Sequence, residues 1–463
     1  MKTYQDLVAV GENEESRQKF ITDAITEHCS SEMYRQAEIA EQYANGKNVL
    51  ISEYQKFLYT ISGDKVPDNF TANHKMKSGL FKRYVGQMAA YLLGNGVTCK
   101  KNPANHDKLG DKFDKNLYFY GRTAKIEAVT FGFWNVNHVD WFKLLEFVPL
   151  WDEENGKLGG GIRFWQLGPK KPMRITLYEL DGFTEYIKDS KGNMTILQPK
   201  RAYKLIGERT DAMGNVIKEG ENYDQLPIVP LWGNANKQSS LIGVKEQIDC
   251  YDLIKSGFAN DLDDASMLYW TLTNYGGMDE IDLVKFVERI KTIRAAVVEG
   301  EGARAEAHTI DVPYQSREAY LAILKKDFIE DTQMLNVEQI QAGNVTATQI
   351  EAAYEPINEA TDEFEFLVID FCQEIFKLAG IDDIPTFKRS QMKNQTEETQ
   401  MILSAANYLD EETLLDKLPF LTNDEVEIVK KKKAAEEAKR FIDTGDGDTG
   451  DGNQQTEGGE GEE

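Results

Sequence analysis

Two spacings of hydrophobic residues divide the chain into helical and strand-forming parts. A spacing of three to four residues, which places apolar side chains on one face of an α-helix, recurs in five segments: 15–62, 73–93, 239–264, 314–336 and 350–378. Gly94-Asn95-Gly96 ends the second segment, because glycine and asparagine favour helix ends. The last segment has the most regular stripe, and Pro356 inside it predicts a kink, because proline removes a helical hydrogen bond.

From about residue 97 to 235 the pattern changes to short runs rich in β-branched and aromatic residues. The runs are LLEFVPLW, GIRFWQL, MRITLYEL, GFTEYIKDS and NMTILQP. Turn signals such as Asp181-Gly182 and Lys191-Gly192-Asn193 separate them, as is typical of antiparallel strands. An antiparallel region between helical parts makes the predicted fold class α+β.

The remaining segments are less regular. Residues 265–312 are mixed, with a strand-like run at Ala295–Val298, and residues 395–441 are helical and charged. The tail from residue 444 has no apolar residue. It cannot offset the entropy lost on ordering, so we expect it to be disordered.

Length and charge limit the possible classes of protein. The 463 residues predict two to four packed units. The net charge of −25 argues against a free-standing DNA-binding domain, which is usually basic, but DNA can pass an acidic surface without being gripped. No apolar run is long enough to span a membrane, and the N-terminus lacks the apolar core of a signal peptide. We therefore expect a protein made and kept in a cytoplasm.

The residues that usually carry chemistry form no recognisable site. The P-loop, the H-E-x-x-H zinc motif and the G-x-S-x-G nucleophile motif are absent. The five histidines are scattered, and the four cysteines are too far apart for a zinc or disulfide pattern. The sequence therefore predicts reduced thiols, no metal, no cofactor and no enzymatic activity.

Six short patterns, in order along the chain, resemble portal proteins of the long-tailed phages of Gram-positive bacteria. The first, at 69–98, has an asparagine-rich entry, a basic amphipathic helix and an aromatic–Leu–Gly element before a short strand. The second is Tyr120–Ala124, and the third is LEFVPLWD at 145–152. The fourth is the most extensive: Leu226–Leu231, followed by the helical run IDCYDLIKSGFANDLDD.

The last two patterns lie in the C-terminal half. Gly343–Thr348 is similar to the turn that opens the family's longest helix, although Thr346 and Thr348 replace smaller residues. Tyr408–Leu415 resembles an element in which the family has serine where this chain has Asp410, and both residues cap helices well. Together the six patterns cover roughly residues 15–440.

The resemblance implies a portal-type fold with a wing, a two-helix stem, a small mixed clip and a helical C-terminal crown. Carried onto this chain, it implies an N-terminal arm at 1–14, a wing at 15–238, stem helices at 239–264 and 313–336, a clip at 265–312, a tunnel loop at 337–346, a long wing helix at 347–385, a crown at 386–441 and a disordered acidic tail at 442–463.

The function implied by the resemblance is structural. Such subunits form a ring, typically a dodecamer, at one capsid vertex, with a channel for packaging and ejecting double-stranded DNA. The implied partners are further copies of the chain, the DNA, terminase, the major capsid and scaffolding proteins, and a head-completion or tail adaptor protein, with no membrane. The expected location is the portal vertex of the virion, after assembly in the bacterial cytoplasm.

Two sets of residues are candidates for contact with DNA. The tunnel loop offers polar, uncharged side chains suited to weak phosphate contacts: Gln339, Gln341, Asn344 and Thr346. The stem helices carry basic residues: Lys255, Arg317, Lys325 and Lys326. The basic residues could guide phosphates or form ion pairs between subunits, and the sequence leaves both open.

Two alternatives to a portal subunit remain. Another phage head protein would lack two long helices around a small mixed domain. A metal-dependent nuclease would need several carboxylates converging on one cleft.

Overall fold

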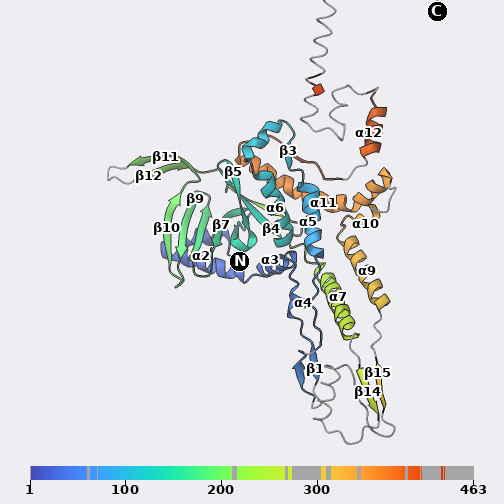
Figure 1. Ribbon diagram of the computed structural model, residues 1–463. Helices are drawn as coiled ribbons and strands as arrows, with labels where there is room; N and C mark the ends of the chain where they lie inside the picture. The colour runs from blue at the N-terminus through green and yellow to red at the C-terminus, as the bar shows by residue number, and fades with distance from the viewer. Residues whose placement is uncertain are drawn as a thin grey trace, which may run out of the picture. The chain divides into compact units, whose positions relative to one another are not determined.

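The computed structural model describes residues 2–59, 63–69, 71–210, 216–265, 269–273, 304–308, 314–340, 346–391 and 395–406, with 408, 429–430 and 432. The chain forms two compact units (Figure 1). The first comprises Met1–Gln339 and Ala353–Gln391, and the second comprises Ile340–Ala352 and Met392–Glu463. The run Ala295–Val298 and the tail from 444 lie outside the described residues.

The N-terminal segment forms four short helices: α1 (Tyr4–Val10), α2 (Glu14–Cys29), α3 (Glu32–Ala44) and α4 (Val49–Glu53). Side chains of Asn13, Ser31 and Asn48 each accept a hydrogen bond from the first turn of the helix that follows. The prediction of helix over 15–62 was therefore too long. Polar capping residues divide the segment, and β1 (Phe57–Tyr59) pairs with β2 (Lys65–Pro67) at its end.

Helix α5 (Leu80–Leu93) begins seven residues later than predicted and ends at Gly94, as expected. Strand β3 (Val97–Cys99) follows, then the 3₁₀ helix η1 (Pro103–Leu109) and α6 (Phe113–Glu127). The prediction that strands begin at about residue 97 missed both helices. The buried residues of α6 include Phe113, Leu117 and Ala124, a helical spacing that the aromatic content of the segment obscured.

The β region is antiparallel throughout its paired strands, as predicted. Strands β4 (Val129–Asn135), β5 (His138–Lys143) and β13 (Ile228–Trp232) form a sheet in the order β13-β4-β5. After η2 (Leu144–Glu146), a five-stranded sheet contains β6 (Phe147–Trp151), β7 (Leu158–Trp165), β8 (Met173–Glu179), β9 (Gly182–Lys188) and β10 (Met194–Arg201), and β11 (Lys204–Thr210) pairs with β12 (Val216–Glu221).

The C-terminal half returns to helix. Its elements are α7 (Lys245–Ala265), β14 (Tyr269–Thr273) paired with β15 (Arg304–His308), α9 (Tyr314–Asp331), α10 (Val337–Ile340), α11 (Ala347–Leu378), β16 (Pro385–Phe387) paired with β3, and α12 (Gln395–Ser404). Helix α7 begins six residues after the predicted start at 239. Pro356 lies inside α11, which continues on both sides of it.

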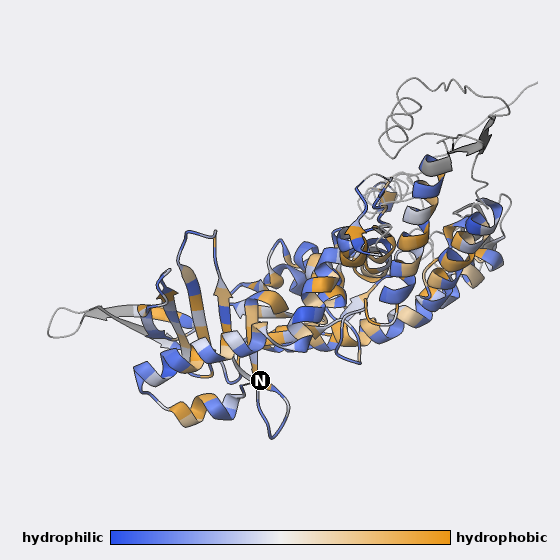
Figure 2. Ribbon diagram, turned by 90° about the horizontal axis from the view of Figure 1, so that it is seen from below, coloured by the Kyte–Doolittle hydropathy of each residue, from blue (hydrophilic) through white to orange (hydrophobic). Residues whose placement is uncertain are grey.

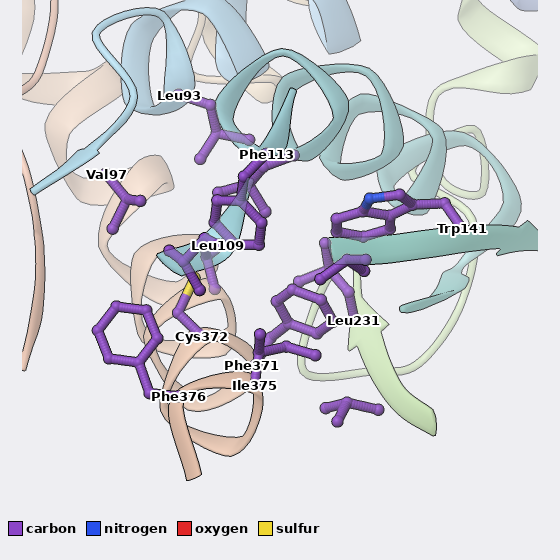
Figure 3. Close-up of a cluster of buried hydrophobic side chains, with 14 of the residues drawn as sticks. Leu93, Val97, Leu109, Phe113, Trp141, Leu231, Phe371, Cys372, Ile375 and Phe376 are labelled. Carbon is purple, nitrogen blue, oxygen red and sulfur yellow. The ribbon is translucent and has the colours of Figure 1, made fainter. Parts of the chain in front are cut away.

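Apolar faces of helices and strands meet in several buried clusters. In one, Phe113 of α6, Trp141 of β5 and Leu231 of β13 surround Phe371 and Ile375 of α11 (Figure 3). Burying each such side chain stabilises the fold by about 1.5–3 kcal/mol. In Figure 2, hydrophilic and hydrophobic residues alternate along the helices and strands, as this segregation requires. The mixture of helices with antiparallel sheets confirms the α+β class.

Candidate functional site

The α7–α9 pair holds the basic residues that the sequence suggested for DNA contact. The two helices lie side by side in the first unit (Figure 1). Phe328 is the one buried side chain of the 18-residue α9. Tyr314, Tyr320 and Ile323 of α9 are exposed. Since tertiary packing supplies most of the stability of a helix, α9 gains little from its own chain.

Three of the four basic candidates are paired with carboxylates of the same chain. Arg317 forms an ion pair with Asp261 of α7. The Nζ atom of Lys325 lies 2.7 Å from a carboxylate oxygen of Glu338. Lys326 lies 3.5 Å from Glu330, one turn along α9. These pairs neutralise much of the positive charge without DNA or a neighbouring subunit.

The fourth basic candidate has an aromatic neighbour. The Nζ atom of Lys255 lies 5.9 Å from the ring centroid of Tyr251, one turn earlier on α7. Such a contact between a cation and a ring is weakly favourable at a partly exposed site. The contact of Lys255 thus stays within α7, whereas the ion pair of Arg317 links α9 to α7.

The segment predicted as a tunnel loop is partly helical. Residues 337–340 form α10, which begins where Asn336 Oδ1 accepts a hydrogen bond from the Glu338 N–H at 3.1 Å. The prediction of loop was wrong for these four residues, Gln339 among them. Gln341 and Asn344 lie outside the described residues. The hydrogen bond from Lys325 lowers the pKa of Glu338, with the positive charge of Lys325 as the next cause.

Thr346 has a local structural role. Its Oγ1 accepts a hydrogen bond from the Gln349 N–H at 3.3 Å, while the Thr346 N–H donates to Gln349 Oε1 at 3.1 Å. This reciprocal pair is a capping box at the start of α11. The spacing Thr-x-x-Gln from Thr346 to Gln349 is the sequence signal of this cap.

Buried polar residues on α7 hold the segment before α5 by hydrogen bonds. Their spacing along the chain gave no sign of this role. The N–H groups of His74, Met76 and Ser78 donate to the side chains of Asn260, Ser256 and Asp252, at 2.6, 3.0 and 2.8 Å respectively. We call residues 73–79 the strap. All three acceptor residues are buried.

The spacing of the strap matches that of the helix. Two residues of extended chain advance about 6.6–6.8 Å, and four residues of helix advance about 6 Å. Alternate N–H groups of the strap can therefore meet every fourth side chain of α7. This match explains why the helix predicted from residue 73 begins only at Leu80, since the strap bonds to α7 instead of to itself.

The same face of α7 also binds the helices before the strap. Asp252 accepts a hydrogen bond from Asn48 Nδ2 at 2.9 Å, and Asp249 accepts one from the hydroxyl of Tyr43. Lys245 Nζ lies 2.6 Å from Asp249. Burial raises the pKa of Asp252, and the hydrogen bonds from Asn48 and Ser78 oppose that shift. Residues of the first and fourth sequence patterns thus meet in one network.

The strap runs antiparallel to α7, because its residue numbers rise as those of its partners fall. His74 lies near Asp263, with 3.5 Å between Nε2 and the carboxylate. The β1–β2 hairpin precedes the strap and therefore lies toward the C-terminal end of α7, the end that leads to β14 (Figure 1). Phe57 and Val66 of this hairpin are exposed.

Other chemistry-bearing groups are isolated. Within the described ranges, no group of three or more His, Cys, Asp or Glu residues could hold a metal ion, and no helix is both long and apolar enough to cross a membrane. The four cysteines are free. His28 is buried with Nε2 2.9 Å from the Leu144 carbonyl, and burial lowers its pKa.

Comparison with known proteins gives a family over most of the chain. The family model for "Phage portal protein, SPP1 Gp6-like" matches residues 23–440. A portal protein of Clostridium phage phiCD119 is 28% identical over 218 residues, which are 45% of this chain and 48% of that protein, so the match spans about half the relative's length. A portal protein of Bacillus phage SPP1 is 20% identical over 413 residues, covering 82% of this chain and 80% of the relative.

Proposed function

Because the chain belongs to the SPP1 Gp6-like family of phage portal proteins, we propose that it forms a ring at one capsid vertex and encloses the channel for DNA packaging and ejection. Proteins of this family are structural components of the virion. The observation that best supports a ring is α9, an 18-residue helix with one buried side chain and several exposed apolar ones. Neighbouring subunits would cover that surface.

The parts of the ring follow the order of the elements. Helices α7 and α9 would be the stem, and the β14–β15 pair would belong to the clip. Helix α11 would be the long wing helix, with residues 386–441 as the crown and 337–346 as the tunnel segment. The strap supports the stem assignment, because it ties α7 to the helices of the wing through buried hydrogen bonds.

The charges of the stem suit DNA that slides. Lys and Arg contacts to phosphates release counterions and bind DNA tightly. In this chain Arg317, Lys325 and Lys326 already have carboxylate partners. A channel wall built from the stem would therefore offer few free cations, so DNA would pass with weak, reversible contacts.

The proposed partners follow from this position. The ring would contain about twelve copies, take up double-stranded DNA, and dock terminase and later a head-completion or tail adaptor protein at the clip. Its outer surface would contact the major capsid and scaffolding proteins. Assembly would take place in the cytoplasm of the bacterial host, and the portal would carry out no catalysis itself.

The test is the assembly state of the purified protein. Light scattering and negative-stain microscopy, over a range of salt and protein concentrations, should show rings with a central hole. A species that stays monomeric under all these conditions would contradict the proposal. Metal-dependent cleavage of DNA by the same preparation would support the nuclease alternative instead.

A further inference from the structure

Helix α11 presents an exposed face, at whose edge Arg389 of the same chain pairs with Asp362. The face, here called the acidic face, consists of Glu355, Glu359, Phe366 and Asp370, all exposed. Steps of four, seven and four residues keep these side chains on one side of a helix. Phe366 is 67% exposed. The three carboxylates have no ion pair or hydrogen bond with any residue that the structure describes.

Helix α6 presents a second uncovered face, of opposite sign. The face, here called the basic face, consists of Lys112, the residue just before α6, together with Lys115 and Phe119 on its first two turns. Phe119 is 48% exposed. Neither lysine side chain has a partner among the described residues, although the exposed Asp111 beside Lys112 reduces the net charge.

The two faces belong to helices that bury their inner sides in one common cluster. Helices α6 and α11 approach through Gly121, where a Cβ atom would lie 3.6 Å from Phe364 Cζ and 2.5 Å from Leu93 Cδ1. Phe113 of α6 and Phe371 of α11 point into the same buried cluster (Figure 3). Strands β4, β5 and β13 complete this cluster, so the acidic and basic faces both lie on the outside of one core, on two different helices.

This arrangement favours a head-to-tail contact. Pairing the acidic face with its own copy in a two-fold dimer would place like charges together. In a ring, each subunit has two unlike interfaces, one toward each neighbour, and repeating this one contact closes the ring. An exposed phenylalanine amid charges on each face would supply the apolar centre of such a contact.

We propose that the acidic face of α11 in one subunit packs against the basic face of α6 in the next. The occupant of each face is a second copy of this chain, because the two faces carry complementary charge and their charged side chains have no ion-pair partner among the described residues. The interface rests on the proposed function, since it requires a ring.

A charge-reversal cycle tests the pairing. One variant carries Glu355→Lys, Glu359→Lys and Asp370→Lys, a second carries Lys112→Glu and Lys115→Glu, and a third combines all five. Opposed like charges are strongly unfavourable at an interface, so each of the first two variants should lower the fraction of rings at least about tenfold. The combined variant should restore rings. Mass photometry and negative-stain microscopy measure this fraction.

Matched controls separate the interface from general charge. Reversing three exposed carboxylates elsewhere, with Glu12→Lys, Glu15→Lys and Glu154→Lys, should leave the fraction of rings unchanged. Phe366→Ala tests the apolar centre without altering charge and should reduce ring formation while the melting temperature of the subunit stays the same.

Each result has a distinct meaning. Wild-type rings together with full ring formation by both reversal variants and by Phe366→Ala would overturn the interface and leave the proposed function standing. Loss of rings in both reversal variants without rescue in the combination would overturn the specific pairing. A wild-type protein that never forms rings would overturn the proposed function and the interface with it.

Discussion

Helices α11 and α9 are both long, yet they use their hydrophobic residues in opposite ways. Helix α11 buries a continuous stripe against its own chain, including Ile357, Phe364, Val368 and Phe371. Helix α9 buries Phe328 alone and leaves Tyr314, Tyr320 and Ile323 exposed. The stripe of α11 is buried within one subunit, whereas the exposed apolar residues of α9 would be covered by other subunits in the proposed ring. The stability of the subunit therefore depends on the buried stripe of α11, whereas the proposed assembly would use exposed surfaces, those of α9 and the acidic face of α11.

The largest effect that separates the two helices should come from truncating their apolar side chains. Phe371 is 1% exposed, and its ring centroid lies 5.1 Å from that of Trp141. Phe371→Ala should destabilise the subunit by about 3–5 kcal/mol through lost burial and a cavity. Urea denaturation at a protein concentration too low for rings measures this effect.

The matched change on α9 is Ile323→Ala, at a residue that is 52% exposed. It should change subunit stability by less than about 0.5 kcal/mol but reduce ring formation. Equal losses of subunit stability in both variants would abolish the contrast between the two helices.

A smaller loss of stability should follow when the strap is detached from α7. Asp252→Ala removes the acceptor of the Ser78 N–H and the Asn48 amide, both of which it meets on the buried side of α7. Leaving buried donors without partners costs about 1–3 kcal/mol. Ser256→Ala removes one acceptor and should cost about 1 kcal/mol.

Hydrogen exchange and melting temperature both measure how firmly the strap is bound to α7. Amide exchange at Met76 and Ser78 should become faster in the Asp252→Ala variant, while exchange in α11 should stay unchanged. Asp252→Asn keeps one acceptor oxygen and serves as the milder control. Protection that persists at Ser78 in the alanine variant would show that the strap is held by other contacts.

The contrast between α11 and α9 also marks what could be predicted from the sequence. The stripe of α11 and the antiparallel strands follow from local spacing, and both predictions are confirmed. The same spacing in α9 predicts a helix correctly but cannot reveal what covers its apolar residues, because covering depends on neighbours. Sequence spacing thus identifies helices better than it identifies their partners.

The errors had two kinds of cause. The strap was predicted as helix because its hydrogen-bond partners on α7 lie more than 170 residues away, and no local pattern contains that information. Thr346 was different, since its capping partner Gln349 is three residues away and a capping box could have been read directly. The partners of Arg317 and Lys325 lie on other elements, which no local pattern reveals, whereas the pair of Lys326 with Glu330, one turn away on α9, could have been predicted.

The buried carboxyl group of Glu127 makes the stability of the folded subunit depend on pH. Glu127 is 1% exposed, and burial raises the pKa of its carboxyl to about 8. Lys143 opposes this shift, Glu41 adds to it, and the backbone N–H groups of Leu144 and Leu145 oppose it. Although Lys143 Nζ lies 3.9 Å from the carboxylate, desolvation dominates, because the side chain has no water contact.

The sign of the pH effect follows from the raised pKa. The folded protein binds the proton of Glu127 more tightly than the unfolded chain, whose pKa is near 4.5. The stabilisation that the protonated Glu127 gives the folded protein is therefore full below about pH 4.5, and it is lost as the pH rises toward 8. Glu127→Gln should raise stability by about 1–3 kcal/mol at pH 8 and above, with little change at pH 5. A melting-temperature difference that does not grow between pH 5 and pH 9 would contradict the assignment.

The smallest change in stability, and the sharpest test of the stem, concerns the pair between Lys325 and Glu338. Both side chains reach the surface, with exposed fractions of 36% and 72%, and exposed ion pairs contribute little to folding. Glu338→Gln should therefore leave the melting temperature and ring formation unchanged. It would free the positive charge of Lys325, and free lysines add counterion-dependent grip on phosphates. If the stem lines the channel, rings of this variant should retain double-stranded DNA more strongly at low salt than wild-type rings, and packaging should slow.

The double variant Glu338→Gln with Lys325→Gln removes the freed charge and should restore wild-type behaviour. Identical DNA retention by all three proteins would place Lys325 away from the DNA, and the weak grip of the channel would then need another source than the ion pairs of α9.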